Sequence, residues 1–103
     1  MTRVKKVLLI GGGGTLGSSI IRSKIFQDLD APKKKDLNLL KKSSINKFLK
    51  NEYNLIINCA AVARMKECEN NSSKAIKVNI LGTLNLVKEI KKYEANYKKK
   101  KQN

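Results

Sequence analysis

Residues 7–21 read VLLIGGGGTLGSSII, an apolar run that leads through four glycines into a different pattern. The run Val4–Ile10 is short and rich in branched residues, which is typical of a buried β-strand. From Thr15 onward the apolar residues follow the spacing of one helix face. These residues are Leu16, Ile20, Ile21 and Ile25. The stretch therefore predicts a strand, a glycine-rich turn and a helix, in that order.

This arrangement suits a phosphate group, because the first N–H groups of a helix have no internal partners and the helix dipole favours an anion there. Glycines also let the backbone approach the phosphates. Gly12-x-Gly14-x-x-Gly17 fits the general dinucleotide fingerprint, and Gly11-x-x-Gly14-x-x-Gly17 fits the spacing of short-chain dehydrogenases. A Walker A loop is excluded, because Ser18 stands where its lysine is required. We predict dinucleotide binding, with a flexible turn as the alternative.

The rest of the chain continues to alternate between strand and helix patterns. A weak strand is predicted at Asp28–Ala31, ended by Pro32, and a turn at Asp36–Leu40. Ser44 is predicted to cap a short helix. The residues that this helix would bury are Ile45, Phe48 and Leu49.

A second clear strand is predicted at Asn54–Ala61, and a long amphipathic helix from Lys74 to about Tyr93. Gly82 within that helix costs about 1 kcal/mol relative to Ala, which indicates close packing there. The alternation predicts an α/β fold, a Rossmann-type parallel sheet with flanking helices and right-handed crossovers. The elements amount to a first βαβαβ half.

The composition restricts the class of protein. A chain of 103 residues with 41% hydrophobic residues can form one small domain with a modest core. Neither a membrane span nor a signal peptide is expected. Cys59 and Cys68 lack metal-ligand spacing and the chain has no His, so no metal site is expected. Scarce cysteines suit a reducing compartment, and we expect a cytoplasmic protein.

The net charge of +15 has two interpretations. It suits a partner such as nucleic acid, or it reflects the drift toward Lys, Asn and Ile that AT-rich coding DNA produces. The lysines are scattered among apolar positions, and the few aromatic residues form no stacking platform. Nucleic-acid binding is therefore the least favoured of the functions that we consider.

Four motifs, in order along residues 4–92, carry a resemblance to a known family. They are the glycine run, Asp36-Leu37, Asn58-Cys59-Ala60-Ala61, and Cys68-Glu69 followed by Ala75, Val78-Asn79 and Gly82-Thr83-Leu84-Asn85-Leu86. Their order and spacing resemble the extended short-chain dehydrogenase/reductase family, in its dTDP-4-dehydrorhamnose reductase-like branch, which also holds GDP-fucose synthase.

The resemblance implies cofactor contacts at the glycine run and at Asp36-Leu37. The turn would be formed by Gly11, Gly14 and Gly17, and the amides that meet the pyrophosphate would be those of Thr15 and Leu16. Asp36 would accept a hydrogen bond from the adenine amine, with Leu37 against the ring. The alternatives are a turn cap for Asp36 and plain core packing for Leu37.

Further contacts are implied at the nicotinamide end of the cofactor. The residues on the ribose side would be Ala60, Ala61 and, next to them, Val62, where family members often carry an aromatic residue. Asn79 would brace the backbone of the active site. Plain packing is again the alternative for the alanines.

The form of the cofactor depends on the segment after the second strand. Sites for NAD carry an acidic residue at the end of this strand, and Asp28 and Asp30 are nearby, but Lys33–Lys35 follow directly. In the resembling branch a basic residue of this segment, here Lys34, meets the 2′-phosphate of NADP. We expect NADP, with NAD as the alternative.

The resemblance also implies that hydride transfer requires a Ser or Thr after the next strand and a Tyr-x-x-x-Lys helix beyond it. Tyr97-x-x-x-Lys101 matches that pattern, but it lies in a run of lysines with no strand before it, so we regard it as a chance match. We therefore expect a truncated cofactor-binding part that is inactive alone, in which Val4–Ile10 is an exposed sheet edge.

The predicted division is a partial NAD(P)-binding Rossmann domain at residues 1–93 and a Lys-rich disordered tail at residues 94–103. The predicted function is the N-terminal part of an NADP-dependent sugar-nucleotide reductase, whose nucleotide-sugar substrate would be bound only in a full-length form. The alternatives are a dinucleotide-binding regulatory module without catalysis and a basic nucleic-acid-binding domain.

Overall fold

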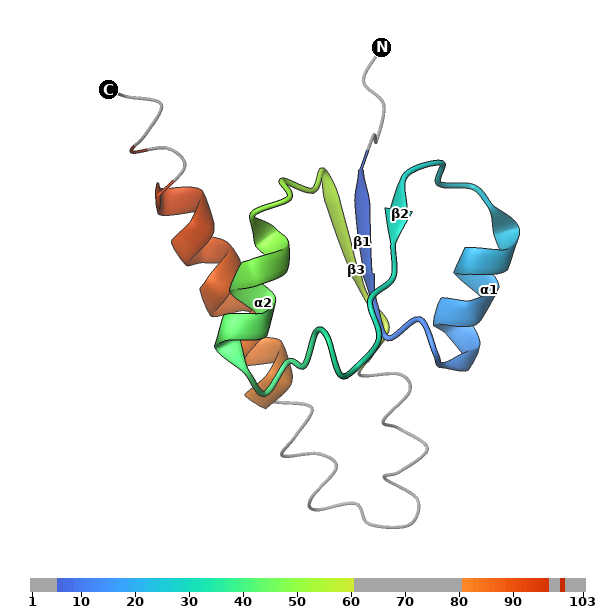
Figure 1. Cartoon of the computed structure of the whole chain (residues 1–103), viewed down its shortest axis with the longest axis horizontal. Coiled ribbons are helices and arrows are strands. Elements are labelled where there is room, and N and C mark those ends of the chain that lie inside the picture. Colours follow the sequence, from blue (N-terminus) through green and yellow to red (C-terminus); the bar gives the residue numbers. More distant parts are fainter. Residues whose placement is uncertain (1–5, 61–80, 97–98, 100–103) are drawn as a thin grey trace.

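A three-stranded parallel sheet lies at the centre of the computed structural model, which describes residues 6–60, 81–96 and 99 (Figure 1). The strand order is β2-β1-β3. The strands are β1 (Val7–Ile10), β2 (Leu29–Asp30) and β3 (Leu55–Asn58).

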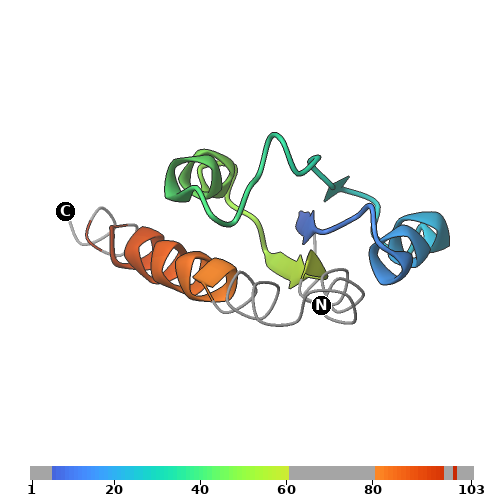
Figure 2. The ribbon, with the colours of Figure 1, turned by 90° about the horizontal axis from the view of Figure 1, so that it is seen from below.

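Helices cover both faces of this sheet. Figures 1 and 2 show α1 (Thr15–Ser23) on one face, and α2 (Lys42–Leu49) together with the helix over residues 81–96 on the other. Parallel strands joined by helices in this way are the arrangement that the alternating pattern predicts. The predicted α/β class and Rossmann-type sheet are confirmed.

The first strand is the central one. Val7 lies opposite Leu29 of β2 and also opposite Leu55 of β3. All four residues of β1 are buried, none more than 4% exposed. The expectation that this apolar strand would be an exposed edge is therefore wrong. Both of its neighbours come from the same βαβαβ half, so no later strand is needed to cover it.

The core fills the face of the sheet that carries α2. Its buried members are Leu8, Ile10, Leu37, Leu39, Ile45, Leu49 and Leu86. Ile45 and Leu49 are buried and Phe48 is half-buried against them, as predicted. A Cβ added at Gly82 would lie 3.1 Å from the Cβ of Leu39, which confirms the close packing that this glycine indicated.

The predicted cap of α2 is wrong. The N-cap residue is Lys41, which makes no side-chain cap, and Ser44 lies within the first turn of the helix. The hydroxyl of Ser44 accepts the N–H of Asn38 at 3.0 Å and donates to the carbonyl of the same residue at 2.8 Å. Ser44 therefore fastens the preceding loop to the helix, because the chain before α2 folds back over its first turn.

Helix α1 begins at Thr15 as predicted, but its apolar face is only partly buried. The helix ends at Ser23, and Lys24 takes a left-handed conformation at φ 55°. Ile25 therefore lies beyond the helix and is 68% exposed, and Leu16 is 47% exposed. The residue of α1 that is buried is Gly17, and it packs closely against Gly11 and Gly12 of the loop that follows β1.

The long helix predicted from Lys74 to about Tyr93 is seen over residues 81–96. Its predicted start and the loop Val62–Ser73 lie outside the described residues. Residues 94–96 continue the helix, and the division into a domain and a tail stays a prediction. Within the described part of the chain, no helix combines the length and apolar character needed to cross a membrane.

Candidate functional site at the glycine loop

The chain leaves β1 through Gly11, whose backbone adopts a φ of 85°. This left-handed conformation favours glycine. The position is also crowded, because an added Cβ would lie 2.5 Å from the backbone nitrogen of Ala60 and 2.7 Å from the carbonyl carbon of Cys59. Gly11 is therefore required by the close approach of the chain after β3, independently of any ligand.

The loop is tied to the first turn of α1. The N–H of Gly14 donates to the carbonyl of Gly11 at 3.3 Å, and the hydroxyl of Ser18 donates to the carbonyl of Gly12 at 3.1 Å. An added Cβ at Gly17 would overlap the carbonyl oxygen of Gly11. The start of α1 thus lies directly against the glycine loop.

The start of α1 is electropositive. Its N-cap is Gly14, which has no side chain to cap the first amides, and its first turn contains no acidic residue. The first N–H groups of a helix find no partner within the helix, and they include those of Thr15 and Leu16. Together with the helix dipole, they favour an anion at this end.

The end of β3 forms the neighbouring wall. The N–H of Cys59 donates to the carbonyl of Ile10 at 2.7 Å, so the parallel pairing with β1 continues past the strand. The side-chain oxygen of Asn58 then accepts the N–H of Ala60 at 3.0 Å and turns the chain. Cys59 is 3% exposed, and burial raises the pKa of its thiol, which makes it an inert packing residue.

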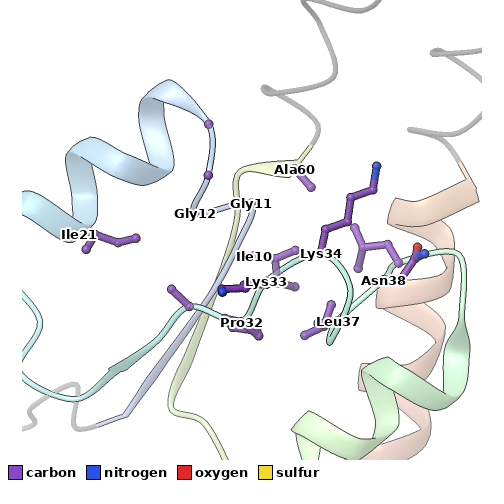
Figure 3. Close-up of a pocket in the computed structure, with 14 residues that line it drawn as sticks. Ile10, Gly11, Gly12, Ile21, Pro32, Lys33, Lys34, Leu37, Asn38 and Ala60 are labelled. Atoms are coloured by element: carbon purple, nitrogen blue, oxygen red, sulfur yellow. The ribbon is translucent and has the colours of Figure 1, made fainter.

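These segments enclose a pocket of about 510 Å³ at the carboxyl ends of the strands (Figure 3). Ligands of open α/β sheets bind at this edge. The lining residues are Ile10, Gly11, Gly12, Gly13, Gly14, Ile21, Ala31, Pro32, Lys33, Lys34, Leu37, Asn38, Leu39 and Ala60.

The charged lining of the pocket is basic. Lys33 and Lys34 are exposed and line it, and none of its lining residues is acidic. In Figure 3 the side chain of Lys34 extends on the side of Ala60, whereas that of Lys33 extends on the side of Ile21. The pocket therefore offers two ammonium groups in addition to the helix N-terminus, all suited to anionic groups.

The structure brings together some of the residues predicted to bind a cofactor. Those that line the pocket are Gly11, Gly14, Lys34, Leu37 and Ala60. Those that lie at the start of α1 but do not line it are Thr15, Leu16 and Gly17. Those outside the described residues are Ala61, Val62 and Asn79.

Asp36 lies away from the pocket. It is exposed on a turn in which its N–H donates to the carbonyl of Lys33 at 2.9 Å, and it does not line the pocket, whereas its neighbour Leu37 is 4% exposed and does. A contact between Asp36 and adenine stays a prediction. The observed turn is the alternative role that the sequence left open.

Sequence reasoning missed the floor of the pocket. Asn38 and Leu39 line it, and the side-chain amide of Asn85 donates to the carbonyl of Leu39 at 2.8 Å from the helix over residues 81–96. Asn38 also accepts the N–H of Leu40 through its side chain at 2.9 Å, which shapes the turn. No spacing rule links residues 38 and 85, so the sequence offered no signal for this support.

A glycine loop between a central parallel strand and a helix, with a pocket at the carboxyl edge, defines the class of Rossmann-type α/β proteins. Comparison with known families narrows this class. The family described as RmlD substrate binding domain matches residues 5–97, and the chain belongs to that family. The predicted relationship to the dTDP-4-dehydrorhamnose reductase-like branch is confirmed.

Solved structures agree with this assignment. A dTDP-4-dehydrorhamnose reductase from Clostridium acetobutylicum is 31% identical, with a TM-score of 0.62 over 79% of this chain and 30% of that one. The GDP-mannoheptose C4 reductase MlghC from Campylobacter jejuni, solved with NADP bound, shares the fold at 18% identity, with a TM-score of 0.60 over 86% of this chain and 28% of that one. The chain thus spans less than a third of either relative. No curated protein sequence matches it significantly.

Proposed function

We propose that this chain forms the NADP-binding part of a reductase that acts on a nucleotide-linked 4-keto sugar. The observation that carries the proposal is the pocket of about 510 Å³ between the glycine loop and Lys33-Lys34. The pyrophosphate would lie at the start of α1, near the amides of Thr15 and Leu16, because that end is electropositive.

The choice of NADP over NAD is supported by charge. The 2′-phosphate is an anion, and the segment that leaves β2 contributes Lys33 and Lys34 to the pocket. An ammonium group forms a charge-assisted hydrogen bond with a phosphate, and this bond is about twice as strong as a neutral one. NADH carries a neutral hydroxyl in place of this phosphate, so the same lysine cannot form an ion pair with it.

The other end of the cofactor is supported by position. Ala60 lines the pocket beside the glycine loop, which leaves the nicotinamide ribose room on the β3 side. The proposal extends this side to Ala61 and Val62, with Asn79 bracing the backbone. The sugar-nucleotide substrate is proposed from the family and from the reductases that share the fold.

The test is fluorescence titration of the purified chain with NADPH, NADH and duplex DNA. We expect NADPH to bind more tightly than NADH. Lys34→Ala should weaken the binding of NADPH about tenfold, which is the effect of one hydrogen bond to a charged group. The affinity for NADH should stay nearly unchanged. The matched control is Lys47→Ala, which removes an exposed lysine of α2 outside the pocket.

Binding of neither dinucleotide refutes the proposal, and salt-sensitive DNA binding in its place supports a nucleic-acid-binding domain. The reductase role is tested separately, by NADPH oxidation with a nucleotide-linked 4-keto sugar in the natural protein that carries this sequence. NADPH binding without turnover there would support a regulatory module.

A further inference from the structure

Strand β2 ends on an acidic residue, Asp30. This residue follows the glycine loop by roughly 20 positions, where a carboxylate of NAD sites accepts a hydrogen bond from the ribose 2′-hydroxyl. The next residue, Ala31, lines the pocket, but Asp30 does not. The acid that would favour NADH is thus present in the sequence and withdrawn from the pocket in the structure.

Tyr53 is what holds this carboxylate. Its hydroxyl donates to Oδ2 of Asp30 at 2.5 Å. The side-chain amide of Asn51 donates to the same hydroxyl oxygen at 3.3 Å. A tyrosine hydroxyl has a single proton, and since the amide contacts the oxygen as a donor, that proton is committed to Asp30.

The ring of Tyr53 is held in turn by its surroundings. It packs against the core cluster on the α2 face of the sheet, and the ammonium group of Lys6 lies 5.6 Å from its centroid. In the parallel register Asp30 lies opposite Leu8, so both side chains are on this same face. Tyr53, from the segment before β3, thereby reaches the end of β2 across β1.

We propose that Tyr53 is a positioning residue that sets cofactor specificity by holding the Asp30 carboxylate away from the dinucleotide. A released carboxylate at the end of β2 would repel the 2′-phosphate of NADPH and accept a hydrogen bond from the 2′-hydroxyl of NADH. With Asp30 held, Lys33 and Lys34 supply the charge of this part of the pocket. The inference rests on the proposed dinucleotide site.

The test compares dissociation constants for NADPH and NADH in the full chain. Tyr53→Phe keeps the ring and removes the hydroxyl. It should lower the preference for NADPH by about tenfold or more, the effect of one hydrogen bond to a charged group. Adding Asp30→Asn to Tyr53→Phe should restore the preference, because the freed group is then neutral. Asp30→Asn alone should leave the preference at the wild-type value, because the carboxylate already lies outside the pocket.

Each outcome has a distinct meaning. A wild-type chain that binds neither dinucleotide refutes the proposed function, and the inference falls with it. A wild type that prefers NADPH, with an unchanged ratio in Tyr53→Phe, overturns the inference alone. A changed ratio in Asp30→Asn alone also overturns it, because Asp30 would then contact the cofactor directly. If Tyr53→Phe fails to fold, the ratio measured for Asp30→Asn can therefore still overturn the inference.

Discussion

Gly11→Ala is the substitution that most directly tests the geometry of the glycine loop. An alanine there would be forced to a φ of 85°, and its Cβ would meet three backbone atoms of Cys59 and Ala60 between 2.5 and 2.8 Å away. Left-handed backbone costs a non-glycine residue about 1–3 kcal/mol. Overpacking against atoms that cannot rotate away costs about 1–3 kcal/mol more.

The expected loss in the free energy of unfolding is therefore about 2–6 kcal/mol. A small domain has only about 5–15 kcal/mol in total, so the folded population should fall measurably. For a chain of this size each kcal/mol lowers Tm by roughly 4–8 °C. We expect Gly11→Ala to lower Tm by at least about 8 °C, measured by circular dichroism on heating.

The matched control is Gly13→Ala in the same loop. A Cβ at Gly13 would meet nothing within 4 Å, and this glycine has no left-handed φ. Its Tm should stay the same or rise by roughly 2–8 °C, because an unstrained Gly→Ala change stabilises a protein by about 0.4–1 kcal/mol. Equal Tm values for the two variants would refute the close approach of β3 to the loop.

Three other predictions concern the core, the pocket floor and Tyr53. Ile45→Ala should lower the free energy of unfolding by about 2–5 kcal/mol, because Ile45 is 0% exposed. Leu40→Ala, at a residue that is 45% exposed, should lower it by under about 1 kcal/mol. Equal losses for the two variants in urea denaturation would contradict the described core. Asn85→Ala should lower the free energy of unfolding by about 1–3 kcal/mol, because it leaves the part-buried carbonyl of Leu39 without its donor. An unchanged free energy of unfolding would show that this hydrogen bond does not stabilise the pocket floor. Burial, followed by the hydrogen bond to Asp30, raises the pKa of Tyr53 to about 12 from the ordinary 10.0. Because the folded pKa is the higher one, this group's contribution to stability is complete below about pH 10 and is lost as the pH rises to about 12. The difference in ultraviolet absorbance titration between the wild type and Tyr53→Phe isolates this tyrosine, and a midpoint near 10 would disprove the shift.

Local patterns were enough to predict the class of fold and the location of the glycine loop. A buried strand and an amphipathic helix each leave a period in the sequence, and glycines mark where the period changes. The run from Val7 to Ile21 carries all three signals within one stretch. The same reasoning predicted burial at Ile45 and Leu49, and close packing at Gly82.

Local patterns failed where a residue's role depends on a distant segment. Ser44 has the residue type of a helix cap, but it binds a loop that folds back over α2. Leu16 has the spacing of a buried residue, but α1 packs against the glycine loop through Gly17 and leaves Leu16 exposed. Periodicity describes one element alone, whereas burial depends on what packs against it.

The glycine loop itself shows the division most clearly. Sequence alone predicts that glycines follow the first strand and suit a phosphate. The tertiary structure decides which of them must be glycine. Gly11 must be, because Ala60 approaches it closely, whereas a side chain at Gly13 would meet no other atom. The tertiary structure likewise decides that Asp30, an acid in the position typical of NAD sites, is bound by Tyr53. Parallel pairing brings residues of β2 and β3 against β1, and such contacts between distant residues leave no period in the sequence.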